Sequence, residues 1–403
     1  MAHFDARCAR HDLSGWAGTN SSGSGMSLAR STATSDQNRV VARTNIQSIL
    51  VNQTKFIGDV ILTSVLTRHL RATYPKATIA LLCASGLEHF VVALGIADIA
   101  IPFGRRRMRG TPYERASELY RVTSTIRRQK FDVTIDLSDS KTSRILTRLI
   151  NAPIRVGFDP PESPLRIWEM QPANVFAATY GHGGEHYLYR YLSPLTALGI
   201  ELEDPVPSLQ PVKACQDEAR ELLARHKLAR GSFVAVHAGA SFEGRCWQPE
   251  RFASAIGEIY ERSGLAAVVV GGPDETPIAQ KVLDAATSPV VSLVGKASLE
   301  VLAALLSEAF IFLGNESGPM HLAAAVKTPV VGLFGLTSPD IWGPLGVPNR
   351  TLRPSMPCQC TAKGICKEDE TGRVYCVQRL EVADVAKSAL ELIDVLRRDP
   401  IAV

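Results

Sequence analysis

The chain has 403 residues, which allows two to four domains at about 100–200 residues per domain. Hydrophobic residues make up 45% of the chain and charged residues 21%, which excludes a wholly disordered, collagen-like or coiled-coil protein. The net charge of +4 is too small to indicate a nucleic-acid partner, and no stretch approaches the ~18 apolar residues of a membrane span.

The first 45 residues are predicted to form a disordered tail. Between Ser14 and Asp36, 14 of 23 residues are Ser, Gly or Thr, so the segment cannot bury enough surface to offset its ordering entropy. It also lacks the apolar core of about 7–15 residues that a secretory signal needs. We therefore expect a cytoplasmic protein whose folded part begins near Ile46.

Short apolar runs then alternate with amphipathic stretches, a pattern typical of βαβ units around a parallel sheet. Strands are expected at 49–51, 78–82, 99–101, 133–137 and 154–158. Helices are expected after Gly58 up to Pro75, and at 87–94, 112–129 and 145–150. This half of the chain therefore resembles half of a doubly wound protein.

A proline-rich stretch then interrupts the alternation. Three prolines lie within residues 205–211 and cannot continue a helix or a central strand, so residues 206–212 are predicted to be a linker. Beyond it, strands are expected at 233–237, 266–270, 310–313 and 330–334, and helices at 214–226, 251–262, 278–286, 299–306 and 321–326. We expect an α/β protein whose two Rossmann-like domains, residues 46–205 and 213–403, face a central cleft.

The first motif with chemistry is Lys55–Thr63, between the first strand and the first helix. Gly58 allows a tight turn, and Asp59 follows at the start of the helix, where the helix dipole favours an ionised carboxylate. Such a carboxylate in a cleft can accept a proton from a substrate hydroxyl. An ordinary helix cap is the alternative interpretation.

The second motif, His237–Trp247, follows a strand of the second half. Its small residues let backbone N–H groups approach an anion, and Arg245 offers a guanidinium suited to phosphate oxygens. The alternative is a loop with one solvated arginine.

The third motif, Gly271–Glu275, also follows a strand. A carboxylate here is placed as in dinucleotide folds, where an acidic residue bonds a ribose diol. A helix cap is again the alternative.

The fourth motif, Gly314–Ala325, predicts a strand, a short loop and a helix with Pro319 in its first turn. A helix N-terminus reached through small residues is a phosphate site, and Glu316 beside it suits a ligand that joins a phosphate to a polyol. His321 alone would more often be a core histidine.

In this order, the four motifs resemble glycosyltransferase family 9, the ADP-heptose:lipopolysaccharide heptosyltransferases, from about Ile46 to the end of the chain. Glu316–His321 is the most specific segment. Lys55–Thr63 and Arg245-Cys246-Trp247 look closest to enzymes that add a branching, third-type heptose. The resemblance implies a GT-B fold, with an N-terminal acceptor domain and a C-terminal nucleotide-sugar domain.

The resemblance also implies roles for single residues. Asp59 falls on the catalytic base, and Gly58 lies beside it on the acceptor side. Arg245 stands where the family usually has a lysine, and Glu316 where it usually has an aspartate. Asp274 falls on the acidic nucleoside contact, with Glu275 one residue away as the alternative. The donor-binding residues implied are Ser241, Arg245, Asp274, Glu316, Ser317, Gly318 and His321.

The implied reaction is an inverting displacement that needs no metal. Asp59 would deprotonate a hydroxyl of the lipopolysaccharide inner core while ADP leaves from ADP-heptose. The alternatives are another nucleotide-sugar donor, a nucleotide-sugar epimerase or a non-catalytic binder. A dinucleotide-dependent oxidoreductase would need Gly-x-Gly-x-x-Gly after the first strand, which Phe56-Ile57-Gly58-Asp59 does not supply.

Four cysteines cluster near the end of the chain, in a segment that is often Cys-rich in the resembled family. Cys358, Cys360, Cys366 and Cys376 have the spacing Cys-x-Cys-x5-Cys-x9-Cys. A structural zinc or iron site, free or redox-active thiols, and disulfides are all open, and a reducing cytoplasm disfavours the last.

A run of arginines in the first half includes Arg105, Arg106, Arg107 and Arg109. Such a run is expected to attract an anionic lipid surface or a phosphorylated sugar core, with Arg105 and Arg106 as acceptor-binding residues. Because the family's acceptors lie on the inner leaflet, weak association with the inner face of the cytoplasmic membrane is expected. A solvated loop is the alternative.

Overall fold

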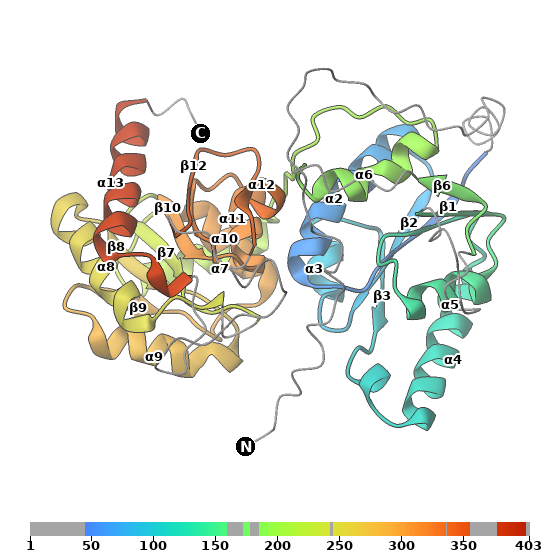
Figure 1. Cartoon of the computed structure of the whole chain (residues 1–403), viewed down its shortest axis with the longest axis horizontal. Helices are drawn as coiled ribbons and strands as arrows, with labels where there is room; N and C mark the ends of the chain where they lie inside the picture. Colours follow the sequence, from blue (N-terminus) through green and yellow to red (C-terminus); the bar gives the residue numbers. More distant parts are fainter. Residues whose placement is uncertain are drawn as a thin grey trace, which may run out of the picture.

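The computed structural model describes residues 45–158, 172–177, 185–241, 245–335, 337–354 and 377–399. These residues form two lobes that lie side by side, the first drawn from blue to green and the second from yellow to red (Figure 1). The expected tail, residues 1–45, lies outside the described residues except for Asn45. The cysteine segment 358–376 lies outside them entirely.

The first lobe is built on a parallel sheet with the strand order β3-β2-β1-β4-β5-β6. Its strands are β1 (Ser48–Gln53), β2 (Thr78–Ala84), β3 (Ile99–Phe103), β4 (Val133–Asp136), β5 (Ile154–Phe158) and β6 (Val175–Ala177). Its helices are α2 (Ile57–Thr73), α3 (Glu88–Ala93), α4 (Pro112–Gln129), α5 (Lys141–Ile150) and α6 (Leu188–Ala197). The strand order reverses between β1 and β4, where ligands of such sheets bind.

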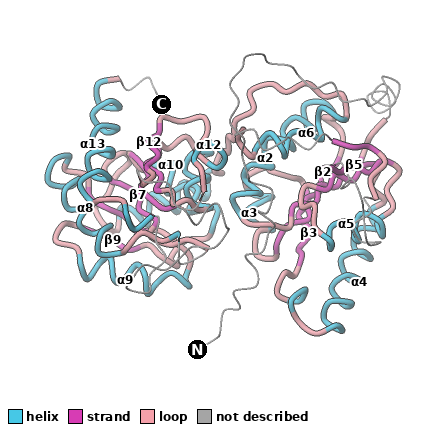
Figure 2. The backbone as a smooth tube through the Cα atoms, viewed as in Figure 1, coloured by secondary structure: helices cyan, strands magenta, loops and turns pink. Residues whose placement is uncertain are grey.

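The second lobe repeats this plan with the order β12-β11-β10-β7-β8-β9. Its strands are β7 (Phe233–His237), β8 (Ala266–Val269), β9 (Val290–Ser292), β10 (Ile311–Asn315), β11 (Val330–Leu333) and β12 (Asn349–Leu352). Its helices are α7 (Lys213–Ala224), α8 (Pro249–Ser263), α9 (Thr276–Ala285), α10 (Leu299–Glu308), α11 (Gly318–Ala325), α12 (Pro339–Trp342) and α13 (Val382–Arg398). In both lobes helices flank the strands (Figure 2).

The central strands are apolar and almost completely buried, as expected for a parallel sheet that is covered on both faces. Leu50 of β1 pairs with Ala80 on one side and Thr134 on the other, so β1 runs through the middle of its sheet. In the second lobe β10 has the corresponding position between β7 and β11. The loops that follow β1 and β10 therefore leave their sheets at equivalent places.

The connection between the lobes has no helix or strand from Glu201 to Val212. The Leu209 N–H donates to the Ala325 carbonyl at 2.8 Å, which ties this stretch to the end of α11. Across the described ranges, no helix is both long and apolar enough to cross a membrane.

Candidate active site

The two lobes meet where α2 and α11 begin, and the backbones come very close there. A Cβ added to Gly318 would lie 2.2 Å from Cγ2 of Ile57, and one added to Gly58 would lie 3.1 Å from Cδ2 of His321. Glycine at both positions therefore lets the loop of the first motif touch the loop of the fourth. Two segments about 260 residues apart in the chain form one site.

Asp59 lies in the first turn of α2 at this junction and is 8% exposed. Its Oδ2 accepts a hydrogen bond from the Phe56 N–H at 3.0 Å, which is a capping interaction. Its Oδ1 accepts a hydrogen bond from the Tyr191 hydroxyl of α6. Asp59 thus contributes a capping bond to α2 from the third helical position, and its charge also acts on Glu316 of the second lobe.

Aromatic rings surround the Asp59 loop, and sequence reasoning missed them. The Lys55 ammonium lies 5.6 Å from the ring centroid of Tyr187 and 5.8 Å from that of Tyr191. The two rings meet edge to face at 5.1 Å, and Tyr187 stacks on Trp342 of α12 at 4.3 Å. The closely spaced tyrosines of segment 187–191 were the available sequence signal.

The start of α11 is arranged differently from the start of α2. Ser317 occupies the N-cap position but makes no side-chain cap bond, and α11 has no acidic residue in its first turn. The Ser317 hydroxyl lies 3.0 Å from Nδ1 of His237. The helix dipole here therefore meets no carboxylate of the first turn of α11, which suits an incoming anion.

Glu316 precedes this loop and is paired with an arginine. Its Oε2 lies 3.4 Å from Nη1 of Arg245 and accepts a hydrogen bond from the Thr337 hydroxyl at 2.6 Å. Burial raises the pKa of Glu316, against the opposing effects of Arg245 and Thr337, and the nearby charge of Asp59 raises it further. The second and fourth motifs are thus joined by an ion pair.

Glu275 of the third motif also lies near the start of α11, to which His237 connects it. Oε1 of Glu275 lies 3.0 Å from Nε2 of His237, and its Oε2 accepts the Gly272 N–H at 2.8 Å. Burial raises the pKa of Glu275, but the bond and charge of His237 and the Gly272 N–H outweigh it, so the pKa lies below its ordinary value. Glu275, His237 and Ser317 form a continuous chain of polar contacts. Asp274, in contrast, is exposed.

The other predicted donor residues lie on the second lobe. Ser241 is exposed and directly precedes residues 242–244, which lie outside the described part. His321 is buried against Gly58, and burial together with nearby His186 lowers its pKa to about 3. His321 is therefore neutral at physiological pH. The fourth motif contributes this histidine to the junction itself.

The arginine run lies partly against the Asp59 loop. Nη1 of Arg105 donates to the Lys55 carbonyl at 3.3 Å, and its guanidinium lies 4.3 Å from the Phe56 ring centroid. Arg107 pairs with Glu118 at 3.6 Å, and Arg106 is exposed. Of the two predicted acceptor-binding arginines, Arg105 therefore contacts the Asp59 loop directly, as does Gly58, the third predicted acceptor-binding residue, which is part of that loop.

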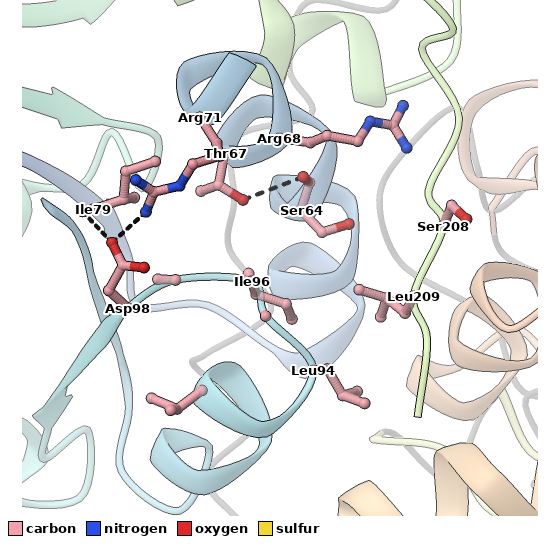
Figure 3. A pocket seen from close by; sticks show the side chains of 13 residues that line it. Ser64, Thr67, Arg68, Arg71, Ile79, Leu94, Ile96, Asp98, Ser208 and Leu209 are labelled. Carbon is pink, nitrogen blue, oxygen red and sulfur yellow. Dashed lines mark hydrogen bonds and ion pairs between the residues drawn. The ribbon is translucent and has the colours of Figure 1, made fainter. Parts of the chain in front are cut away.

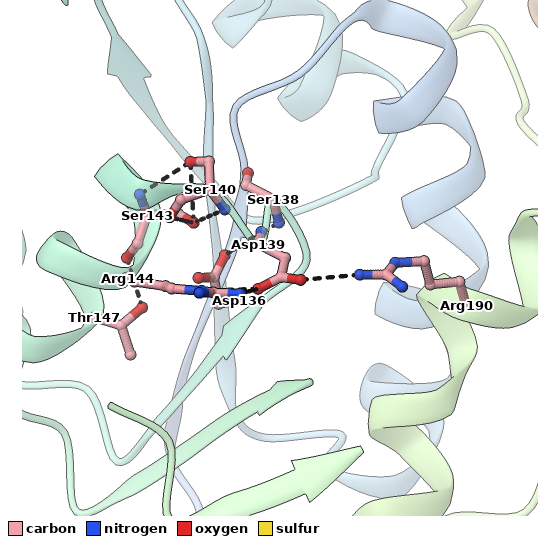
Figure 4. Close-up of polar contacts among 8 residues, drawn as sticks. All are labelled: Asp136, Ser138, Asp139, Ser140, Ser143, Arg144, Thr147 and Arg190. Atoms are coloured by element: carbon pink, nitrogen blue, oxygen red, sulfur yellow. Dashed lines mark hydrogen bonds and ion pairs between the residues drawn. The ribbon is translucent and has the colours of Figure 1, made fainter. Parts of the chain in front are cut away.

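Two further polar regions lie in the first lobe. A cavity of about 460 Å³ lies between α2 and residues 94–98 and is closed on one side by Ser208 and Leu209 (Figure 3). Asp59 is not among its lining residues. The second region is a polar cluster at the end of β4, where Asp139 bonds both Arg144 and Arg190 (Figure 4). Burial raises the pKa of Asp136 in this cluster to about 7.

No group of three His, Cys, Asp or Glu side chains that could hold a metal ion occurs within the described part of the chain. The four clustered cysteines fall in the segment that the structure does not describe. A structural zinc or iron site therefore stays one of the three alternatives that the sequence leaves open for them.

The fold class follows from solved structures of the same architecture. The fold is similar to a family 9 glycosyltransferase from Veillonella parvula, with a TM-score of 0.71, 22% identity and coverage of 87% of this chain and 100% of that one. It is also similar to ADP-heptose lipopolysaccharide heptosyltransferase II from Escherichia coli, with a TM-score of 0.67, 19% identity and coverage of 87% and 100%. The predicted GT-B fold is confirmed.

The family follows from the sequence itself. Residues 119–371 match the profile of glycosyltransferase family 9 (heptosyltransferase), and the chain belongs to this family. It is 28% identical over 294 residues to lipopolysaccharide heptosyltransferase 3 of Escherichia coli, covering 72% of this chain and 84% of that relative. It is 23% identical over 320 residues to lipopolysaccharide heptosyltransferase 2 of Salmonella typhimurium, covering 76% and 87%. The expected family and enzyme class are confirmed: the chain is a glycosyltransferase.

Proposed function

We propose that this enzyme transfers a heptose from ADP-heptose to a sugar hydroxyl of the lipopolysaccharide inner core. The observation that carries the proposal is the contact between α2 and α11, which brings Asp59 near a helix N-terminus suited to phosphate. The curated relatives that are similar to the chain are named as lipopolysaccharide heptosyltransferases, which supports the heptose donor and the core acceptor.

On the acceptor side, Asp59 is the proposed general base. Its carboxylate is held by the Phe56 N–H and the Tyr191 hydroxyl, and it retains acceptor positions for a substrate hydroxyl. Gly58 lets the loop of the first motif, which begins at Lys55, approach the second lobe. Arg105 and Arg106 are proposed to attract the anionic core, and the contact of Arg105 with the Asp59 loop supports this role.

On the donor side, the ADP diphosphate is proposed to bind at the start of α11. The N–H groups around Ser317 and Gly318 would meet its charge as it leaves, together with Arg245 and the neighbouring Ser241. Well-placed donors of this kind lower a barrier by about 2.7–4 kcal/mol each in other enzymes. Arg245 would exchange its pairing with Glu316 for the phosphate, and Glu316 would then be available to the sugar.

The nucleoside contact is proposed to be Glu275 in preference to Asp274. The Glu275 carboxylate lies over Gly239 and Gly271, where added Cβ atoms would come within 1.9 and 2.4 Å of its oxygens. It thus occupies the carboxyl ends of β7 and β8, where nucleotides bind in such sheets. His321 is proposed to pack beneath the sugar as a neutral side chain.

The proposed reaction is a single displacement without a metal. Asp59 takes the proton of the acceptor hydroxyl as its oxygen forms the bond to the anomeric carbon. The bond from that carbon to the ADP oxygen breaks, and ADP leaves with the electron pair. In this single displacement the acceptor oxygen attacks on the face opposite the leaving ADP, so the configuration at the anomeric carbon inverts.

In this proposal one lobe binds the acceptor and the other binds the donor. Residues 46–205 form the acceptor domain, 206–212 the linker, and 213–403 the donor domain with its Cys-rich segment. The enzyme acts in the cytoplasm, with weak contact to the inner face of the membrane through the arginine run. Sedimentation with anionic liposomes at low salt tests that contact, and elemental analysis of untagged protein tests the cysteines for zinc or iron.

A thermal-shift comparison of ADP-, UDP-, GDP- and dTDP-sugars tests the donor, because a ligand that binds the folded state raises the melting temperature. We expect ADP-heptose to give the largest shift. A larger shift with another nucleotide-sugar would contradict the donor assignment. Epimerisation of the donor without any acceptor would identify the alternative activity.

A further inference from the structure

The Tyr191 side chain is fully buried, yet its hydroxyl reaches the proposed base. This hydroxyl donates to Oδ1 of Asp59, while the Phe56 N–H donates to Oδ2. The two donors hold both oxygens of the carboxylate and occupy one acceptor position on each. An ionised carboxylate has about four such positions, so the base can still receive a substrate hydroxyl.

Tyr191 is a permanent donor in this environment. Burial, and next the negative charge of Asp59, raise the pKa of Tyr191 well above its ordinary value. The hydroxyl therefore keeps its proton at any pH at which the enzyme works, and it can act towards the Asp59 carboxylate only as a donor.

The helix that carries Tyr191 is fixed on the side of the first lobe. Arg190, its neighbour in α6, bonds Oδ2 of Asp139 at 3.0 Å, and Arg144 of α5 bonds Oδ1 of the same residue at 2.8 Å (Figure 4). The Arg190 guanidinium also lies 4.2 Å from the Phe158 ring centroid. These charges are largely buried, so the cluster holds α6 at the end of β4.

The ring of Tyr191 is fixed from the side of the second lobe. It meets Tyr187 edge to face, and Tyr187 stacks on Trp342 with an interplanar angle of 20°. The Tyr187 N–H also donates to the Ile341 carbonyl of α12 at 2.9 Å. The loop before α12 contains Thr337, which bonds Glu316 of the proposed donor site.

We propose that Tyr191 is a positioning residue: its hydroxyl holds the Asp59 carboxylate in the orientation that receives the acceptor proton. The contact of Tyr187 with Trp342 makes this orientation depend on how the second lobe sits against the first. The inference rests on the proposed role of Asp59 as the base.

The test is steady-state kinetics of Tyr191→Phe, which retains the ring and removes only the hydroxyl. We expect kcat to fall about 10- to 100-fold, the effect of losing a hydrogen bond to a charged group. The KM values for donor and acceptor should stay within about twofold, because the substrates' own contacts are unchanged. If Tyr191 acted only through packing, the Phe variant would keep the wild-type kcat.

Tyr74→Phe is the matched control. The Tyr74 hydroxyl is also buried, has no hydrogen-bond partner within the described structure, and lies at the opposite end of α2. We expect its kcat to equal that of the wild type. Tyr187→Ala is the second variant, which removes the ring that holds Tyr191 but keeps the Tyr191 hydroxyl. It should lower kcat less than Tyr191→Phe does.

The outcomes separate this inference from the proposed function. Normal kcat in Tyr191→Phe, with Asp59→Asn inactive, would overturn the inference alone. Parallel losses of kcat and donor affinity would also overturn it, because they would indicate a general disturbance of the junction. A wild-type enzyme that transfers no heptose would overturn the proposed function instead.

Discussion

Two helices begin at the junction, α2 after β1 and α11 after β10. The first turn of α2 contains an acidic residue and that of α11 does not. The first turn of α2 holds Asp59, whose carboxylate bonds the Phe56 N–H. The first turn of α11 holds Gly318 and Pro319 and no acidic residue. One helix N-terminus is therefore occupied by a carboxylate of its own chain, and the other is suited to a phosphate from the substrate.

The same strand, loop and helix geometry occurs in both lobes, with a different role proposed for each. Both loops leave a central parallel strand at its carboxyl end, and both use a glycine for the close approach of the lobes. What differs is the charge at the start of each helix. In the proposed mechanism, the start of α2 supplies the group that accepts the proton, and the start of α11 binds the leaving diphosphate.

The largest expected effect comes from removing the charge at α2. Asp59→Asn keeps the shape of the side chain but cannot accept a proton, so we expect transfer to fall about 10²- to 10⁴-fold. Stabilisation by ADP should be unchanged, because the proposed phosphate site belongs to α11. Transfer assays and thermal shifts measure the two effects, and normal turnover would refute the base assignment.

The next effect comes from the close approach of the helices. Gly318→Ala puts a Cβ 2.2 Å from Cγ2 of Ile57, and overpacking of this kind costs about 1–3 kcal/mol. Because this cost falls on the junction that transfer requires, we expect kcat/KM to fall about 5- to 150-fold, at roughly 1.4 kcal/mol per factor of ten in rate. Gly257→Ala is the control, since its Cβ would meet Oγ1 of Thr287 at an ordinary 3.6 Å. Equal activity of both variants would show that the contact is dispensable.

His321 makes the start of α11 sensitive to acid. Its pKa is lowered from 6.5 to about 3, so the unfolded state binds a proton first as the pH falls below 6.5. The stability that neutral His321 contributes is complete above pH 6.5 and is lost as the pH falls toward 3. By pH 5 the loss is about 2 kcal/mol.

Chemical denaturation at pH 7 and pH 5 measures this effect. In His321→Asn the difference in free energy of unfolding between the two pH values should be about 2 kcal/mol smaller than in the wild type. His226→Asn, which changes an exposed histidine of the same lobe, should leave that difference unchanged. An unchanged pH dependence in His321→Asn would contradict the burial argument.

The smallest expected effect concerns Glu275, whose carboxylate contacts His237, which in turn contacts Ser317 at the start of α11. Glu275→Gln removes the charge that bonds His237, so we expect donor KM to rise about tenfold. Asp274→Asn changes an exposed side chain, and we expect a change of less than about twofold. Measured donor KM values decide between the two residues, and the reverse order would restore Asp274 as the nucleoside contact.

Much of the fold could be predicted because it depends on local pattern. The central strands are continuous apolar runs, and the helix at 112–129 begins with Thr111, whose side chain accepts the Glu114 N–H. The strands that were missed, β6, β9 and β12, are edge strands of three or four residues, only partly buried. Helices α6, α12 and α13 were also missed, although the apolar residues of α13 recur at helical spacing.

The site could be predicted only in part, because its contacts join distant parts of the chain. Tyr191 lies 132 residues from Asp59, and no local pattern connects the two. The choice between Asp274 and Glu275 depends on the phase of the short helical turn Pro273–Glu275, which directs one carboxylate inward and leaves the other exposed. Motif order indicated which loops meet, and packing decided which side chains face each other.

The most direct test of the central claim is a transfer assay with ADP-heptose and a lipopolysaccharide core acceptor, analysed by mass spectrometry and by the anomeric configuration of the product. We expect the wild-type enzyme to add one heptose with inversion, and Asp59→Asn to transfer about 10²- to 10⁴-fold more slowly while still binding ADP. Addition with retained configuration, or full activity in Asp59→Asn, would contradict that claim.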